Sequence, residues 1–223
     1  MRTLVIFLVL VMATLGNTIP IARADVEFGI SLGDRGLRSF YLSVGDYYRV
    51  PEREVIIIRE RGILYEEIPV VFFIARRVHV APGVIVDLRL RGMSWMDITF
   101  HYGLSPEIYY VPLRVAPGPP YGRAYGYYKK WPRKEWRKVR LGDDDVVNLV
   151  NLKFASEHYG YSPEKVIKMR SGGRNFVEIN EEIKRGKESR VKEKREVWEK
   201  ESKIKEKGEK HGGKEKGKGK FED

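Results

Sequence analysis

The chain has 223 residues, no cysteine and a formal net charge of +11. This length allows one or two domains, and the absence of cysteine excludes disulfide frameworks, thiolate metal sites and thiol catalysis. The excess of base favours contact with polyanions such as nucleic acid, phospholipid head groups or anionic cell-wall polymers.

Residues 1–24 have the pattern of a secretory signal peptide. Arg2 precedes the apolar run LVIFLVLVMATL, and small residues in the sequence ARA stand before Asp25. The apolar run is shorter than the roughly 20 residues that a membrane-spanning helix needs. We therefore predict cleavage between Ala24 and Asp25 and a periplasmic or secreted mature protein, with an uncleaved anchor as the alternative.

A motif that occurs three times follows the signal segment. It reads Pro, an apolar stretch, an aliphatic residue with Arg, then Gly, an aromatic, an acid and Ile, and its copies lie in 51–68, 82–98 and 163–179. Proline suits a first helical turn, glycine suits a left-handed helix end, and SWMD and NFVE have the form of capping boxes. Each copy therefore predicts a helix, a glycine turn and a second helix, and the arginine falls in the last turn of the first. The structural residues expected in these copies are Gly62, Gly92, Trp95, Gly173 and Phe176.

A second repeated phrase is HYGLSPE at 101–107 and HYGYSPE at 158–164. Glycine can end one helix, serine can cap the next, and proline with glutamate can begin it. Both phrases therefore predict a joint between helices, in which His101 and His158 are incidental rather than metal ligands. The residues expected to build the two joints are Gly103, Ser105, Pro106, Gly160, Ser162 and Pro163.

Residues 114–141 combine aromatic and basic side chains with Gly and Pro. Residues 114–140 contain nine basic residues and one acid, and show neither helical nor strand periodicity. We predict an extended linker or surface arm that binds a polyanion or a protein partner, since aromatic faces stack on bases or sugars while cations pair with phosphates or carboxylates. The alternative is that the aromatics fold back on the helices. The residues predicted to bind are Tyr121, Arg123, Tyr125, Tyr127, Tyr128, Lys129, Lys130, Trp131, Arg133, Lys134, Trp136, Arg137 and Lys138.

The predicted fold is mainly α, built from repeated short helical hairpins. We divide the chain into a signal peptide (1–24), hairpin repeats (25–113), the basic aromatic linker (114–141), a further hairpin repeat (142–185) and a Lys/Glu/Gly-rich tail (186–223). The repeat of 142–185 opens with an acidic first helical turn at 143–145. The tail is expected to form a solvated helix, with a coiled coil as one option, to about Lys207 and to be disordered from Gly208.

Catalytic and metal-binding patterns are weak in this sequence. The acidic pairs at 66–67 and 181–182 are expected on exposed or capped helix starts, where they need no catalytic role. The three aspartates at 143–145 lack the ligand spacing of a calcium loop. We therefore predict no catalytic residues, no metal and no cofactor.

Two resemblances follow from these motifs. The segment FASEHYGYSPEKVIKM resembles the helix-turn-helix of DNA-binding proteins, which implies a second helix that enters a major groove. The first phrase departs from that pattern at Tyr109 and Pro112, where aliphatic residues are expected. The longer repeat is similar to units of the type YGVSxEEVxxLRxxGxGWGEI in uncharacterised exported bacterial proteins. That likeness implies fold and location rather than activity.

These observations give a leading and an alternative function. The leading hypothesis is an exported, non-enzymatic helical interaction or scaffold protein that contacts anionic envelope material or a protein partner. The alternative is a nucleic-acid-binding helix-turn-helix protein whose N-terminus is not a signal. A third reading, an envelope hydrolase, requires two acids that face each other in a cleft.

Overall fold

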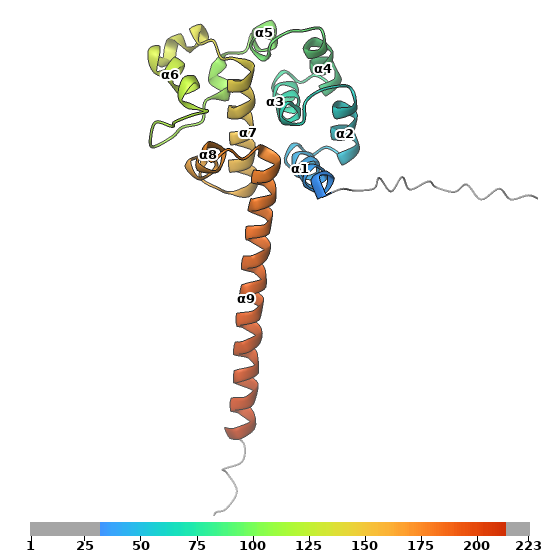
Figure 1. The fold of residues 1–223 in the computed structure, drawn as a ribbon, viewed down its shortest axis with the longest axis vertical. Coiled ribbons are helices and arrows are strands. Elements are labelled where there is room, and N and C mark those ends of the chain that lie inside the picture. Colours follow the sequence, from blue (N-terminus) through green and yellow to red (C-terminus); the bar gives the residue numbers. More distant parts are fainter. Residues whose placement is uncertain (1–31, 213–223) are drawn as a thin grey trace, which may run out of the picture. The chain divides into compact units, whose positions relative to one another are not determined.

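The computed structural model describes residues 32–212 of the chain, and the side chains of residues 35–203 (Figure 1). Over this range the protein is mainly α, as predicted, with nine α-helices, three short 3-10 helices and no strand. The predicted signal peptide at 1–24 and the last eleven residues of the predicted tail, 213–223, lie outside the described residues.

The helices follow the chain in this order. The first half contains α1 (Leu32–Tyr48), α2 (Glu52–Glu60), η1 (Tyr65–Glu67), α3 (Ile68–Val78), α4 (Pro82–Leu90), α5 (Trp95–His101) and η2 (Pro106–Tyr109). The second half contains α6 (Gly122–Lys130), η3 (Arg133–Lys138), α7 (Asp143–Tyr159), α8 (Pro163–Ser171) and α9 (Phe176–Gly212).

The core forms around α3, which is apolar on all sides from Ile68 to Ala75 and buried along that length. A helix with this composition has to be surrounded by other elements. Helix α3 packs against α4 and α7, while α1 packs against α9, which begins 128 residues after α1 ends. Helices from both predicted repeat segments, 25–113 and 142–185, therefore contribute to one core.

All three copies of the long motif form a helix, a glycine turn and a second helical element. Gly62, Gly92 and Gly173 have φ of +102°, +89° and +89°, a region that side chains with a Cβ rarely adopt. In the second copy Ser94 Oγ accepts a hydrogen bond from the amide of Asp97 at 3.0 Å. The capping box of the third copy, at 175–178, is formed in the same way. The motif therefore encodes its own helix ends.

Both short phrases form the predicted joint. Gly103 and Gly160 share a φ of +69°, and the serine two residues later caps the next helix in each case. The second joint leads into α8, whereas the first leads into the single 3-10 turn η2. A full helix is prevented at the first joint because Pro112 lacks an amide hydrogen and restricts the residue before it.

The prediction of an extended linker is wrong, and the alternative is observed. Residues 122–130 and 133–138 form α6 and η3, and the side chains of Tyr121, Tyr128 and Trp136 are buried. Trp136 Nε1 donates to the carbonyl oxygen of Tyr128, and Tyr128 Oη donates to the carbonyl oxygen of Pro106, at 3.1 and 2.7 Å. The cause is the spacing of Tyr121, Ala124 and Tyr128, three and four residues apart, which places them on one helix face.

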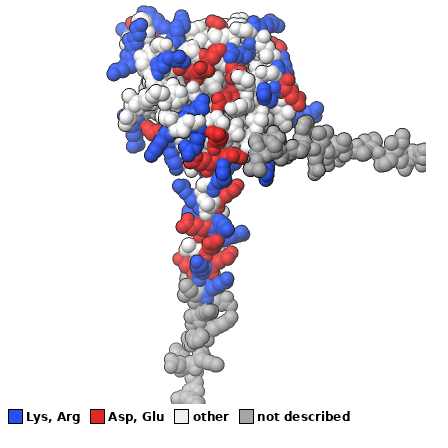
Figure 2. Space-filling model, viewed as in Figure 1, with Lys and Arg blue, Asp and Glu red and all other residues white. Residues whose placement is uncertain are grey.

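The tail is helical beyond the predicted limit of Lys207, because α9 continues to Gly212. Its first turns join the core through Phe176, Ile179 and Ile183, whereas every side chain from 187 to 201 is exposed. Lysines, arginines and glutamates alternate along this exposed part (Figure 2). Across the described residues, no helix has both the length and the apolar character that a membrane span requires.

Candidate functional site

The arginine of each long motif closes its own glycine turn. Nη1 of Arg59, Arg89 and Arg170 donates to the carbonyl oxygen four residues ahead, at 3.1, 3.1 and 2.9 Å respectively. A guanidinium carries five N–H donors in a planar fork. One bond to the turn therefore leaves other donors for a second partner.

In the second copy that partner is a pair of carboxylates from distant parts of the chain. Arg89 Nη1 lies 2.6 Å from Asp143 Oδ2, and Nη2 bonds to Glu67 Oε1. The other oxygen of Asp143 accepts a hydrogen bond from the backbone amide of Trp95, the first residue of α5, at 2.8 Å. We call this arrangement, in which a motif arginine and the first amide of the following helix hold one carboxylate, a carboxylate clamp.

The third copy repeats the carboxylate clamp with another acid. Glu66 Oε1 accepts a hydrogen bond from the amide of Phe176 at 3.0 Å, and Glu66 Oε2 lies 3.8 Å from Arg170 Nη2. Arg170 Nε also donates to Asn148 Oδ1 at 3.1 Å. In both copies the guanidinium lies over the aromatic ring of the motif, 4.8 Å from the ring centre of Trp95 and 5.0 Å from that of Phe176.

The sequence predicted that the acids at 66–67 lie on an exposed or capped helix start. The structure shows instead that both are bonded inside the fold. Glu67 is 8% exposed and also accepts a hydrogen bond from Trp95 Nε1 at 3.1 Å. The reason lies in Leu64, which stands where the other copies have Ser94 and Asn175. Because leucine cannot cap a helix, the acid of the first copy forms no capping box and bonds to Arg89 instead.

A cleft of about 530 Å³ borders this network. Its polar lining includes Glu66, Arg123, Asp145, Asn148 and Arg170. Asp145 is 2% exposed, accepts a hydrogen bond from the amide of Gly142 at 2.9 Å and pairs with Arg123 at 3.1 Å. Glu66 and Asp145 are thus each bound to an arginine and to a helix-start amide, an arrangement that fixes the packing of the helices.

The residues predicted to bind polyanions separate into two groups. Among the aromatics, Tyr121, Tyr128 and Trp136 are buried, Tyr125 and Trp131 are partly buried, and Tyr127 is 38% exposed. All seven predicted cations are exposed; Arg123, Arg133 and Lys138 pair with Asp145, Glu107 and Glu135. The other four, Lys129, Lys130, Lys134 and Arg137, form no ion pair with any residue that the structure describes.

We call these four cations the basic arm face. The two elements that carry them are held together because Trp136 Nε1, in η3, donates to the carbonyl oxygens of Tyr128 and Trp131 at the end of α6, both at 3.1 Å. Figure 2 shows Lys and Arg side chains gathered over the part of the surface where α6 lies in Figure 1. The sequence identified these cations correctly as exposed but assigned the wrong surroundings to the aromatics.

Neither joint histidine contributes to a cluster of ligands. His158 is partly buried and stacks on Phe154 with ring centres 5.5 Å apart, while His101 is exposed. Within residues 35–203 no three acidic or histidine side chains are grouped as a metal site would require.

Stability is expected to depend on pH through His158. Burial lowers the pKa of its imidazole from the ordinary 6.5, with Lys184 and Lys187 adding to the effect and Asp46 opposing it. The unfolded chain therefore binds more protons near this pH, so the free energy of unfolding falls as the pH drops below about 6.5. Denaturant titrations across that range should show a shallower fall in His158→Gln than in the parent chain. Equal slopes in the parent and His158→Gln would contradict the assignment.

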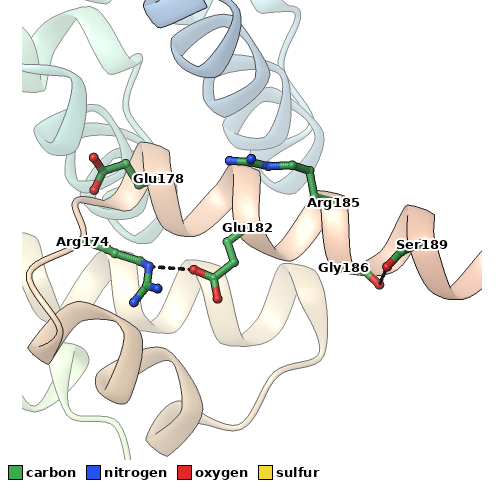
Figure 3. A pocket seen from close by; sticks show the side chains of 6 residues that line it. All are labelled: Arg174, Glu178, Glu182, Arg185, Gly186 and Ser189. Atoms are coloured by element: carbon green, nitrogen blue, oxygen red, sulfur yellow. Dashed lines mark hydrogen bonds and ion pairs between the residues drawn. The ribbon is translucent and has the colours of Figure 1, made fainter.

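A larger and more open hollow, of about 740 Å³, runs along α9 (Figure 3). Arg174 and Glu182 face each other across it and form an ion pair at 2.7 Å. Arg185 pairs with Glu181 one turn earlier at 3.3 Å. Charges that are matched in this way on an exposed helix surface give no sign of a ligand.

In comparisons with known proteins, no family model, no curated protein and no solved structure matches the chain.

Proposed function

We propose that the protein is an exported, non-enzymatic interaction protein that contacts anionic envelope material through the basic arm face. The observation that carries the proposal is the group formed by Lys129, Lys130, Lys134 and Arg137, which are exposed and lack acidic partners among the described residues; their two helical elements, α6 and η3, are anchored in the core by Tyr128 and Trp136.

Two physical features support this role. The backbone that carries the four cations is fixed by Tyr128 and Trp136, so binding does not have to order that segment. The exposed part of α9 alternates cations with glutamates, which weakens its attraction for a polyanion. The basic arm face is therefore the stronger candidate of the two basic segments.

The test replaces all four cations by glutamine. Each cation near an anionic membrane surface adds favourable energy that salt screens. We expect the fourfold variant to bind vesicles of phosphatidylglycerol and phosphatidylcholine at least tenfold more weakly than the parent chain at low salt. The dependence of binding on salt concentration should flatten in parallel. Vesicle sedimentation over a salt series measures both quantities.

A matched control replaces Lys192, Lys194, Arg195 and Lys200 on the exposed part of α9, which removes the same charge elsewhere. It should retain most of the affinity. The basic arm face would be excluded if the two variants weakened binding equally, or if the parent chain bound with no dependence on salt. Equal unfolding free energies for parent and variants show that the substitutions act on binding alone.

Export is proposed from the sequence pattern of residues 1–24. N-terminal sequencing of the protein from fractionated cells should give a chain that starts at Asp25 in the periplasmic or culture fraction. Cytoplasmic protein that retains Met1 would remove the export part of the proposal and favour the alternative below.

The alternative is a nucleic-acid-binding protein that uses the joint between α7 and α8. The left-handed Gly160 and the Ser162 cap favour it, since α7, the turn and α8 follow one another as in a helix-turn-helix. Helix α8 exposes Lys165 and Lys168. If this alternative holds, replacing both lysines by glutamine should weaken binding to duplex DNA more than the fourfold variant of the arm does.

A further inference from the structure

The first copy of the long motif differs from the other two in what its arginine holds. In the second and third copies a carboxylate clamp binds Asp143 and Glu66, acids that lie 54 and 104 residues from their arginines. In the first copy Arg59 makes the same bond to its turn, to the carbonyl oxygen of Ile63. The bond between the arginine and its turn is therefore common to all three copies, although no stacking of Arg59 on Tyr65 corresponds to that of Arg89 on Trp95 and of Arg170 on Phe176.

No carboxylate within the described part of the chain bonds to Arg59, which is partly exposed. Nor does any described side chain accept a hydrogen bond from the amide of Tyr65, which corresponds to the amides of Trp95 and Phe176. Glu67 is turned toward Arg89, and Leu64 provides no cap. The donors that hold a carboxylate in the second and third copies thus recur in the first copy without an acceptor from residues 35–203.

The surroundings of Arg59 add apolar and polar features. Leu64 and Leu90 are 60% and 49% exposed, and a Cβ on Gly62 would lie 3.9 Å from Leu90 Cδ2, so Leu90 borders this turn. Arg59 also lies beside the side chain of Tyr41. Burial raises the pKa of Tyr41, and the positive charge of Arg59 offsets part of that rise.

We propose that Arg59 and the amide of Tyr65 form a third carboxylate clamp, which binds an aspartate or glutamate side chain of a protein partner. The two filled copies identify the chemistry, because they hold protein carboxylates with the same pair of donors. Exposed Leu64 and Leu90 favour a protein over an anionic polysaccharide, since a peptide can place an apolar side chain next to its acid. The site includes no residue of the basic arm face and does not rest on the proposed function.

A pair of short peptides tests the proposal on the full chain. Acetyl-Leu-Asp-Leu-amide and acetyl-Leu-Asn-Leu-amide differ in the carboxylate alone. In an NMR titration of isotope-labelled protein, the Asp peptide should shift the Nε–H signal of Arg59 and the amide signal of Tyr65 saturably, with a Kd of about 1–10 mM. The Asn peptide should bind at least fivefold more weakly. The amides of Trp95 and Phe176 should stay in place, because their clamps hold Asp143 and Glu66.

Substitutions at Arg59 complete the test. Arg59→Gln should reduce the affinity for the Asp peptide at least fivefold, and Arg59→Lys should reduce it several-fold because an ammonium lacks the planar fork. Arg53→Gln, an exposed position on the same helix, should have no effect. If Arg59→Gln does not fold, the lysine variant and the peptide pair decide the question. The proposal is overturned by equal shifts with both peptides, by shifts at Lys129 to Arg137 instead, or by no shift at about 20 mM peptide.

Discussion

Replacing Arg89 by glutamine is expected to lower the free energy of unfolding by about 3 kcal/mol. The substitution removes the partner of Glu67, which is 8% exposed, and of Asp143, and it also removes the bond that closes the turn at Met93. Two carboxylates then remain in a region where water cannot fully replace the guanidinium. The loss stays near the lower end for buried pairs because the side chain of Arg89 is 20% exposed.

Denaturant unfolding of three single variants measures this effect and separates its causes. Arg59→Gln loses one bond to a turn carbonyl and leaves no described carboxylate unpaired, so we expect a cost of about 1 kcal/mol. Arg91→Gln, at an exposed position two residues beyond Arg89, should change stability by less than about 0.5 kcal/mol. A cost for Arg89→Gln no larger than that for Arg59→Gln would contradict a stabilising role of the carboxylate clamp.

The local elements of the fold were predictable because their signals lie within a few residues. Glycine at 62, 92 and 173 marks each turn, and Ser94 with Asp97 forms a complete capping box inside four residues. Helix ends depend on such neighbours. The motif therefore predicted the helix–turn–helix units without knowledge of how they pack.

The carboxylate clamps were not predictable, since Arg89 meets Glu67 and Asp143 across 22 and 54 residues. Nothing in a single sequence pairs an arginine with a particular distant acid. One local sign existed at Leu64, which stands at the position where the other two copies have a capping residue. Without that cap, Glu67 does not accept the hydrogen bond that completes a capping box. An acid that forms no capping box in this way is a candidate for an ion pair with a residue distant in the sequence.

Composition and residue spacing favour different structures for residues 114–140. Gly and Pro in residues 114–126 favoured an extended segment. However, the buried side chains of Tyr121, Ala124 and Tyr128 follow the helical period, and Trp136 then packs over the end of that helix. In a short segment, three apolar positions on one face are enough to fold it when a core surface is available.

Replacing Trp136 by alanine is therefore expected to lower the free energy of unfolding by about 3–4 kcal/mol. The indole is 8% exposed, and its ring centre lies 4.6 Å from that of Tyr110 and 4.8 Å from that of Tyr128. Its Nε1 satisfies two backbone carbonyls at the junction of α6 and η3. Removing it leaves a cavity and two weakened hydrogen-bond acceptors, whereas an extended arm would lose little.

Equilibrium unfolding and limited trypsin digestion check this expectation together. Trp136→Ala should be cleaved at the lysines and arginines of 123–140 faster than the parent chain, because loss of packing opens that segment. Tyr127→Ala, on the exposed side of α6, should cost less than about 0.5 kcal/mol and leave cleavage unchanged. A small effect in Trp136→Ala would mean that the aromatics are available for binding after all. If the effect is large, deletion of 114–140 removes core as well as charge, and substitution of Lys129, Lys130, Lys134 and Arg137 is the informative test of whether these cations bind a polyanion.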